Sequence, residues 1–205
     1  MRAKHLYAIT GSREHLLESV TAAIQGGCQI IQYRDKSSDN KRRLNEATGL
    51  AALCEAHQCQ LIINDDIALA KAVAAHGVHL GQGDDSIKRA RDILGAGAIV
   101  GATCHASLEL ALRAQEQGAG YVAFGRFFTS LTKPQAPQAD IEVLSAARKV
   151  LAIPIIAIGG ITLENAPQLL AAGADILAVG HGLFGAKNIK SQARLYCNII
   201  QGSPA

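Results

Sequence analysis

Short apolar runs alternate with longer amphipathic segments along this chain. Each run is rich in Ile, Val, Leu and Ala, and the segment after it shows the three-to-four-residue spacing of a helix. We count eight such strand-then-helix units. The predicted strands, each with its helix, are 6–10 with a helix through about 24, 28–34 with 41–57, 60–64 with 67–75, 77–81 with 87–94, 98–104 with 107–117, 121–125 with 141–150, 154–159 with 163–171, and 175–180 with roughly 187–200.

Eight buried parallel strands favour a closed barrel. Strands that are apolar on both faces and separated by crossover helices are typical of parallel sheets. We therefore predict a single-domain (β/α)8 TIM barrel over residues 1–205, at the small end of the usual size range. A doubly wound open sheet is the alternative. It requires a glycine-rich turn after its first strand, and Thr10-Gly11-Ser12-Arg13 lacks that fingerprint; there we expect a turn with Ser12 as a candidate N-cap.

Composition narrows the function to small-molecule chemistry. Of the 205 residues, 49% are hydrophobic, which is ample for a core, and the formal net charge is only +3. So small a charge, with no Trp, four Tyr and four Phe, does not favour nucleic acid or a membrane surface as a partner. No apolar run approaches the roughly 20 residues of a membrane span, so we expect a cytoplasmic protein. The five cysteines show no tight ligand spacing and are expected to be reduced.

Candidate functional residues, polar or glycine, follow seven of the eight predicted strands, from the second to the eighth. In a TIM barrel the chemistry lies at the carboxyl ends of the strands, so these residues would share one mouth. The sequence places there Gln32, Arg34 and Lys36 after strand two, Asn64, Asp65 and Asp66 after strand three, Gln82 and Asp84 after strand four, Thr103 and His105 after strand five, residues 129–133 after strand six, Gly159-Gly160 after strand seven, and Gly180-His181-Gly182 after strand eight.

The stretch Gln32-Tyr33-Arg34-Asp35-Lys36 carries long polar side chains at every second position. On a strand that ends at Arg34, Gln32 and Arg34 share one face, and Lys36 lies just beyond it on the same side. Arg offers a two-pronged fork and Lys a compact charge, so the set suits a di-anionic or poly-anionic ligand. Ordinary surface charges at a solvated strand end are the alternative.

Asp65 and Asp84 follow neighbouring strands and would meet at the mouth. Carboxylates that leave room for water and phosphate oxygens are the usual protein ligands of Mg²⁺, so both are candidate metal ligands. The same stretches hold candidate helix caps, Asp65 or Asp66 for the third helix and Asp84 or Asp85 for the fourth. We expect one residue of each pair to cap its helix and the other to bind metal.

Two glycine-rich turns indicate a second anion site. Gly159-Gly160 and Gly180-His181-Gly182 place bare backbone amides before the seventh and eighth helices, an arrangement that binds a monophosphate in many barrels. The long segment 127–140 is a candidate lid, from which Thr132 and Lys133 would reach the phosphates. A cationic, metal-assisted site beside an uncharged backbone site suits the joining of a diphosphate ester to a monophosphate-bearing nucleophile.

The order of these motifs resembles that of the thiamine phosphate synthase family. The resemblance covers nearly the whole chain and rests on residues 32–36, 63–66, 77–82 with Asp84, 124–125 with 130–134, and 158–161. It implies a Mg²⁺-dependent transferase that condenses hydroxymethylpyrimidine diphosphate with thiazole phosphate to give thiamine phosphate and diphosphate. The diphosphate would leave first, because the aminopyrimidine stabilises the methylene cation, and the thiazole nitrogen would then capture that cation.

The resemblance also implies a role for each matching residue. Asp65 and Asp84 would hold Mg²⁺, and Arg34, Lys36 and Lys133 would assist the chemistry as well as bind substrate. The implied substrate-binding residues are Gln32, Arg34, Lys36, Asn64 and Lys133 for the pyrimidine diphosphate, and Ser130, Thr132, Gly160, Gly180 and His181 for the thiazole phosphate or adjoining phosphates, with Thr103 standing where the family often has Ser.

Three positions depart from the family pattern. Thr103 is a conservative hydroxyl, residues 128–131 lack an expected Pro, and Gly180-His181 stands where an aliphatic residue and Ser are usual. We expect the backbone amide of His181 to face a phosphate and its protonated imidazole to replace the hydroxyl donor. A solvent-facing imidazole is the alternative.

Two other functions remain open. A thiazole tautomerase of related fold would use His105 as an acid or base, but it would not need the full set of cations and carboxylates. A catalytically silent sensor of a phosphate ligand is the second alternative, and it is disfavoured because the candidate metal carboxylates are present. The sequence does not set the oligomeric state, so a homo-oligomer stays open. Nor does it say whether the thiazole substrate is carboxylated.

Overall fold

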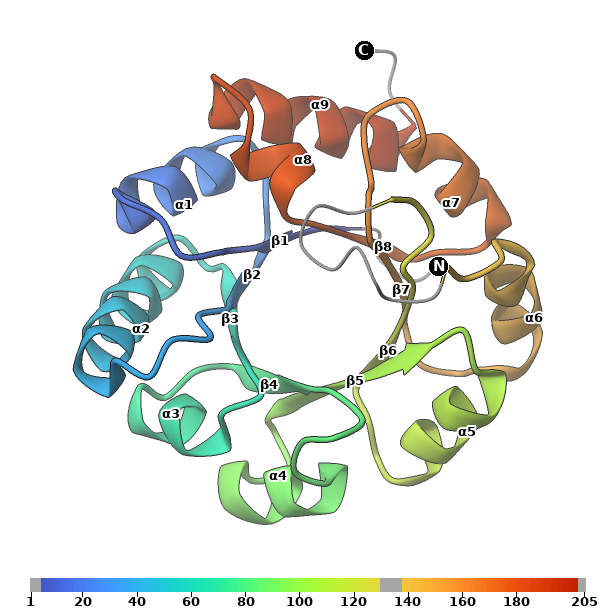
Figure 1. The fold of residues 1–205 in the computed structure, drawn as a ribbon, viewed down its shortest axis with the longest axis horizontal. Coiled ribbons are helices and arrows are strands. Elements are labelled where there is room, and N and C mark those ends of the chain that lie inside the picture. Colours follow the sequence, from blue (N-terminus) through green and yellow to red (C-terminus); the bar gives the residue numbers. More distant parts are fainter. Residues whose placement is uncertain (1–4, 130–137, 203–205) are drawn as a thin grey trace.

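Eight parallel strands form a closed barrel, and the helices surround it (Figure 1). The computed structural model describes residues 5–129 and 138–202. Each strand pairs with its neighbours in chain order, and β1 closes the ring on β8. The strands are β1 (His5–Ile9), β2 (Ile30–Tyr33), β3 (Gln60–Asn64), β4 (Gly77–Leu80), β5 (Ile99–His105), β6 (Tyr121–Phe124), β7 (Ile155–Ile158) and β8 (Ile176–Val179).

The helices pack outside the strands. They are α1 (Leu16–Gln25), α2 (Asn40–Ala56), α3 (Ile67–Ala72), α4 (Ile87–Leu94), α5 (Leu108–Glu116), α6 (Glu142–Val150), α7 (Ala166–Ala172), α8 (His181–Phe184) and α9 (Ile189–Gln201). None of the helices in the described ranges is both long and apolar enough to cross a membrane.

The buried apolar side chains form two layers because successive strand residues point to opposite faces of the sheet. The outer layer lies between the strands and helices, and α2 contributes Ala47, Leu50 and Cys54 to it. The inner layer fills the barrel. Its buried members are Tyr7, Ile30, Ile62, Tyr121, Ala123, Ile156, Ile176 and Ala178. Most strand residues are therefore buried whichever way they point, which explains the nearly continuous apolar runs in the sequence.

The predicted (β/α)8 barrel is confirmed, and every observed strand lies within two residues of its predicted bounds. The five cysteines are free, as expected, with four buried and Cys197 partly exposed.

Three helix starts differ from the prediction. Ser12 does not cap α1, which begins at Leu16 after His15 in a left-handed conformation with φ 52°. The helix α7 begins only at Ala166, with Pro in its first turn, where the missing N–H costs nothing. The one-turn helix α8 was not predicted as a separate element. Asn188 ends the connection after it by capping α9, since its side chain accepts a hydrogen bond of 2.9 Å from the Ser191 amide.

The N-cap prediction beside the proposed metal site is correct for α3 and wrong for α4. Asp66 caps α3, because its Oδ1 accepts a hydrogen bond of 2.9 Å from the Leu69 amide. This leaves the Asp65 carboxylate available, as the prediction requires. Ser86 caps α4 instead of Asp84 or Asp85, so the predicted capping by that pair is wrong. The Ser86 hydroxyl lies one residue nearer the helix and takes the Arg89 amide at 3.1 Å.

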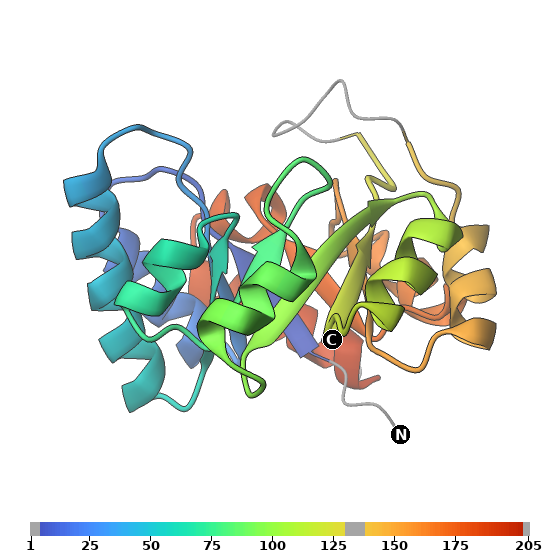
Figure 2. The same cartoon turned by 90° about the horizontal axis from the view of Figure 1, so that it is seen from below.

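The loops that follow the strands gather at one rim of the barrel. In Figure 2 the loops after β2 (blue) and β4 (green) project on the same side, away from the amino-terminal end of the chain. Parallel strands bring all their carboxyl ends to one edge, so residues far apart in sequence meet there.

Candidate active site

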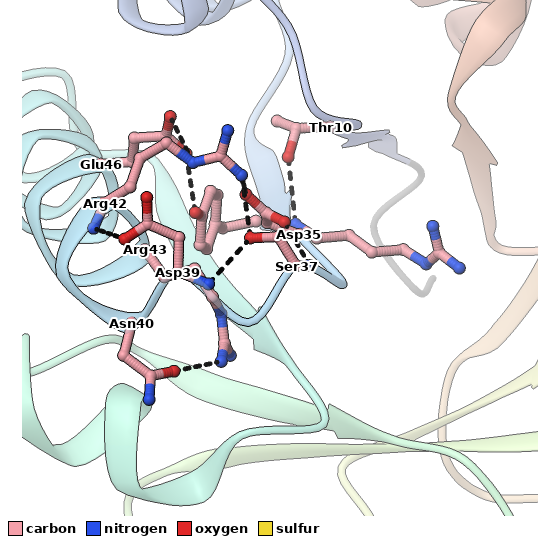
Figure 3. A network of polar contacts seen from close by, with 10 residues as sticks. Thr10, Asp35, Ser37, Asp39, Asn40, Arg42, Arg43 and Glu46 are labelled. Carbon is pink, nitrogen blue, oxygen red and sulfur yellow. Dashed lines mark hydrogen bonds and ion pairs between the residues drawn. The ribbon is translucent and has the colours of Figure 1, made fainter.

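The loop after β2 is anchored to α2 by a network of polar side chains (Figure 3). The Asp35 side chain is only 3% exposed, pairs with Arg42, and accepts a hydrogen bond of 2.7 Å from the Ser37 amide. Burial alone would raise the pKa of Asp35, but the Ser37 hydrogen bonds and the Arg42 cation lower it below its usual value. Asp39 caps α2 by accepting a hydrogen bond of 2.9 Å from the Arg42 amide. The backbone between Arg34 and Lys36 is thus held in place by contacts with α2 and with Ser37 of the same loop.

Lys36, Asp65 and Asp84 form a connected cluster beyond the ends of β2, β3 and β4. The Lys36 ammonium lies 2.7 Å from Asp65 Oδ2. The Asp65 carboxyl group is also hydrogen bonded to that of Asp84, which in turn accepts the Gly81 amide at 2.6 Å. Asp65 has a left-handed backbone with φ 64°, which Asp tolerates better than most residues. The structure therefore brings the two predicted metal ligands together.

The two carboxyl groups have opposite pKa shifts. Burial would raise the pKa of Asp65, but Lys36 and the hydrogen bond with Asp84 lower it overall. Burial and the neighbouring Asp65 carboxylate both raise the pKa of Asp84. Two carboxylates this close repel each other, which favours a shared proton or a cation bound by both.

This donor set fits Mg²⁺. Hard carboxylate oxygens suit the ion, which usually keeps several waters and takes further oxygens from a phosphate substrate. Within residues 5–129 and 138–202, no cluster of three or more His, Cys, Asp or Glu side chains is placed to hold a metal. A site with two protein carboxylates, completed by water and substrate, is therefore the arrangement that the described residues support.

Arg34 and Asn64 adjoin the cluster. The Arg34 amide donates a hydrogen bond of 3.1 Å to Thr10 Oγ1, which ties the ends of β1 and β2 together, and the Arg34 guanidinium has no partner among the described residues. Asn64 pairs in register with His79 of β4 and shares the inward face of β3 with Ile62. Both side chains are half-buried. A cation and an amide thus lie at the same ends of β2 and β3 as Lys36 and Asp65.

Gln32 and Thr103 occupy inward-facing strand positions. Gln32 is 3% exposed and donates a hydrogen bond of 2.8 Å to the Tyr7 hydroxyl. The half-buried Thr103 hydroxyl lies 2.8 Å from Nε2 of His79. Both predicted substrate-binding side chains are therefore tied to other polar groups inside the barrel.

The turns after β7 and β8 meet through their backbones. A Cβ on Gly182 would lie 2.4 Å from the Ile161 carbonyl oxygen, to which the Tyr196 hydroxyl donates at 3.1 Å. Gly160 has φ 68°, and a Cβ there would lie 2.5 Å from the Thr129 carbonyl oxygen. The two predicted glycine turns are therefore adjacent. The predicted start of the seventh helix at 163 is wrong, because α7 begins only at Ala166, so the Gly160 amide does not lie at the N-terminus of that helix.

The exposed His181 opens the short helix α8. Its ring lies along the helix, since a Cβ on Gly185 would lie 2.9 Å from His181 Cε1. Arg13, from the loop after β1, covers the other end of α8 with its guanidinium 4.4 Å from the centre of the Phe184 ring. The imidazole thus has a place beside Gly185, and the predicted contact of its side chain with a phosphate remains a prediction.

Other predicted residues lie at the rim or outside the described part. Ser130, Thr132 and Lys133 fall in residues 130–137, outside the described residues, so their roles remain predictions. His105 ends β5 with φ 51°, and its side chain is exposed.

Comparison with known proteins identifies the family of this barrel. The family model TMP-TENI, thiamine monophosphate synthase, matches residues 6–183. The chain belongs to this family.

Solved structures agree with the family match. A thiamine phosphate pyrophosphorylase from Pyrococcus furiosus superimposes with a TM-score of 0.90 at 32% identity, over 98% of this chain and 97% of that one. Two others are under 25% identical and show the fold alone. One is a thiamine phosphate pyrophosphorylase from Bacteroides thetaiotaomicron (TM-score 0.71, 15% identity, covering 97% of this chain and 99% of that one). The other is an (S)-3-O-geranylgeranylglyceryl phosphate synthase from Thermoplasma acidophilum (TM-score 0.71, 18% identity, covering 98% of this chain and 94% of that one).

Two features of this thiamine monophosphate synthase family member escaped the sequence analysis. One is the Asp35–Arg42 anchor, because an Arg on the exposed face of a helix gives no sign of its partner. The other is the polar side chains inside the barrel, Tyr7, His79 and Tyr121, which are embedded in apolar runs and look like core residues. Their inward position on alternating strand residues was the available signal.

Proposed function

We propose that this chain is a thiamine phosphate synthase, a transferase that joins hydroxymethylpyrimidine diphosphate to thiazole phosphate and releases diphosphate. The observation that carries the proposal is the Lys36–Asp65–Asp84 cluster, with Arg34 just past the end of β2. Cations and a carboxylate pair at one rim are suited to neutralising a departing diphosphate. Membership of the thiamine monophosphate synthase family supports the same activity.

The charged residues act on the leaving group. In the proposed reaction, negative charge builds on the diphosphate as the bond to the pyrimidine methylene breaks. Arg34 and Lys36 stabilise that charge because they are positioned before the reaction begins, and Lys133, which lies outside the described residues, is proposed as a third cation. When bound by Asp65 and Asp84, Mg²⁺ supplies further positive charge to the diphosphate oxygens. Lys36, which pairs with Asp65 in the free protein, gains the substrate as a second anionic partner.

The remaining predicted residues hold the two organic groups. Gln32, Asn64 and Thr103 line the inward side of the mouth, where the pyrimidine ring would lie. The backbone amides near Gly160 and Gly180–His181, with Ser130 and Thr132, would take the thiazole phosphate. The cation formed from the aminopyrimidine needs no base to react with the thiazole nitrogen, so these residues contribute positioning and exclusion of water.

The test is an assay with both substrates. Purified protein is incubated with the pyrimidine diphosphate, the thiazole phosphate and Mg²⁺, and thiamine phosphate and diphosphate are measured together. We expect the two products in equal amounts, and none when either substrate is omitted or chelator is in excess. Absence of thiamine phosphate under all these conditions would refute the proposal. Parallel assays with the thiazole phosphate and its carboxylated form would show which one is used.

The tautomerase alternative is tested in the same series. The exposed His105 at the rim is its candidate acid or base, so a carboxylated thiazole phosphate is supplied alone and its isomerisation is followed. Isomerisation that requires His105, without any coupling to the pyrimidine, would favour the tautomerase. We expect His105→Ala to retain thiamine phosphate formation.

A further inference from the structure

A chain of hydrogen bonds crosses the inside of the barrel. Gln32 of β2 donates to the Tyr7 hydroxyl of β1 at 2.8 Å, and that hydroxyl lies 2.9 Å from the Tyr121 hydroxyl of β6. Tyr121 lies 3.0 Å from Nδ1 of His79 on β4, whose Nε2 lies 2.8 Å from the Thr103 hydroxyl of β5. Four of the five side chains are at most 8% exposed, and Thr103 is half-buried.

The residues inside the barrel pack closely around this hydrogen-bond chain. The His79 and Tyr121 rings stack with their centres 5.6 Å apart, and Tyr7 meets Tyr121 edge-on at 6.0 Å. Gly101, on the inward face of β5, gives the Tyr121 ring its space, since a Cβ there would lie 2.0 Å from the ring. These hydrogen bonds link β1 with β6 and β4 with β6, which are not neighbours in the sheet. The hydrogen-bond chain therefore depends on the closed barrel and not on any one loop.

The Gln32 amide sets the direction of the chain. A hydroxyl that accepts from Gln32 must give its own proton to the next group, and Tyr7 is 1% exposed with no acceptor other than Tyr121 in the described part of the chain. Tyr121 then donates to Nδ1 of His79, the proton of the neutral imidazole lies on Nε2, and Nε2 donates to Thr103. Burial raises the pKa of both phenols, so both keep the protons that this requires. Reversing one bond would leave a buried proton without a partner.

The two ends therefore present different groups to the mouth. The Thr103 oxygen accepts a hydrogen bond from His79 Nε2–H, so its own hydroxyl proton is left to donate to a ligand. Gln32 gives one of its two amide N–H groups to Tyr7, which fixes the orientation of the amide and leaves the carbonyl oxygen to accept from a ligand and the second N–H to donate. A 4-aminopyrimidine matches this pair, because its amino group donates and its ring nitrogens accept. A 4-oxopyrimidine carries an acceptor in place of the amino donor.

We propose that Tyr7, Tyr121 and His79 are positioning residues that orient the Gln32 carbonyl oxygen as an acceptor and the Thr103 hydroxyl as a donor, and so select an aminopyrimidine over an oxopyrimidine. The selection rests on the proposed function, whereas the direction of the chain does not. Two measurements separate them.

The direction is read from the ring nitrogens of His79. Nitrogen-15 chemical shifts at about pH 8, where an ordinary imidazole is neutral, distinguish the two tautomers. The His79 signals are assigned by their loss in His79→Gln. We expect the Nε2–H form in the wild type and the Nδ1–H form in Gln32→Glu, whose carboxylate can only accept from Tyr7 and so reverses every donor. When Tyr121→Phe is added to Gln32→Glu, the His79 tautomer should no longer change. Adding Tyr196→Phe, which removes a buried phenol outside the hydrogen-bond chain, should leave the change intact. The proposal is overturned if His79 carries its proton on Nδ1 in the wild type, or if its tautomer is the same in the wild type and in Gln32→Glu.

The selection is read from binding, so that differences in reactivity do not enter. Dissociation constants are measured for the unreactive monophosphates of the 4-amino and the 4-oxo hydroxymethylpyrimidine. We expect the wild type to prefer the amino compound, and Tyr121→Phe to reduce that preference about tenfold, the effect of one or two neutral hydrogen bonds. Tyr196→Phe should keep the wild-type ratio. An unchanged ratio in Tyr121→Phe overturns the selection. If neither compound binds, the aminopyrimidine assignment falls with the proposed function, while the nitrogen shifts still decide the direction.

Discussion

The rim of this barrel is built in two different ways. On the side of β2 to β4 the groups offered to a ligand are charged side chains, with Lys36, Asp65 and Asp84 in direct contact. On the side of β7 and β8 they are backbone amides beside glycines, where added Cβ atoms would lie as close as 2.4 Å to neighbouring oxygens. A charged site can be dismantled by removing a side chain, whereas a backbone site is disturbed by adding one. The two sides should therefore respond in opposite ways to mutation.

The largest effect should follow from breaking the charged side. We expect Asp84→Ala to lower kcat/KM for thiamine phosphate formation by about 10³-fold or more, because the proposed Mg²⁺ would lose one of its two carboxylate ligands. The free energy of unfolding should change by less than about 1 kcal/mol, since removal of Asp84 also relieves repulsion from Asp65. Steady-state kinetics and urea unfolding test the two expectations.

Asp84→Asn is the matched control for the fold, because the amide oxygen can still accept the Gly81 amide. We expect Asn to restore any lost stability without restoring activity. Full activity of the wild type in excess chelator would contradict the metal role of both carboxylates.

On the backbone side, Gly160→Ala should act mainly through stability. The substitution forces φ 68° on Ala and drives its Cβ toward the Thr129 carbonyl oxygen at 2.5 Å. We expect a loss of about 2–4 kcal/mol in the free energy of unfolding, with a raised KM for the monophosphate substrate only. Gly97→Ala is the control, because a Cβ there meets nothing within 4 Å. Equal stability of the two variants would show that the turn after β7 is not tightly packed.

The anchor beneath the charged side should make a pH-dependent contribution. The pKa of Asp35 is lowered in the folded protein, so the ionised carboxylate stabilises the fold above its unfolded pKa of about 4, and this contribution is lost as the pH falls through the lower folded pKa. We expect Asp35→Asn to cost about 1–2 kcal/mol near neutral pH, because its partner Arg42 is 40% exposed and partly screened. The difference between wild type and variant, measured by urea unfolding, should be constant from about pH 5 to 8 and shrink below about pH 4. A difference that grows in acid would contradict the assignment.

The sequence was informative about the charged side for a physical reason. Strand-then-helix periodicity predicts a barrel, and a barrel places the ends of neighbouring strands together, so Asp65 and Asp84 could be paired without coordinates. The separation of Asp65 from its neighbour Asp66 could not be predicted, because either residue satisfies the pattern of an N-cap and only the backbone angles decide.

The interior of the barrel was less predictable. The bond from Tyr121 to His79 joins strands that do not pair with each other, and no local pattern encodes such a contact. A glycine in the sequence can also have either of two structural roles. Gly160 marks a turn, as the sequence suggests, whereas Gly101 is a strand residue whose missing side chain makes room for Tyr121. A glycine within an apolar run could therefore be interpreted only after the strands were placed around it.

The smallest effect should come from His181, because this one residue could bind the phosphate either through its side chain or through its backbone amide. Its amide opens α8 near the glycine turns, but its imidazole lies beside Gly185, with Cε1 2.9 Å from where a Cβ on that residue would stand. If this side of the rim works through its backbone, His181→Ser should leave both Michaelis constants within about twofold of the wild type, since an exposed substitution that keeps the backbone loses little. A protonated imidazole contacting the phosphate would instead contribute a charge-assisted hydrogen bond, and its loss would raise the KM for the thiazole phosphate about tenfold or more. Michaelis constants of the wild type and His181→Ser for both substrates therefore decide between a side-chain site and a backbone site. A selective rise for the thiazole phosphate would show that the His181 side chain, and not only its backbone, binds the phosphate.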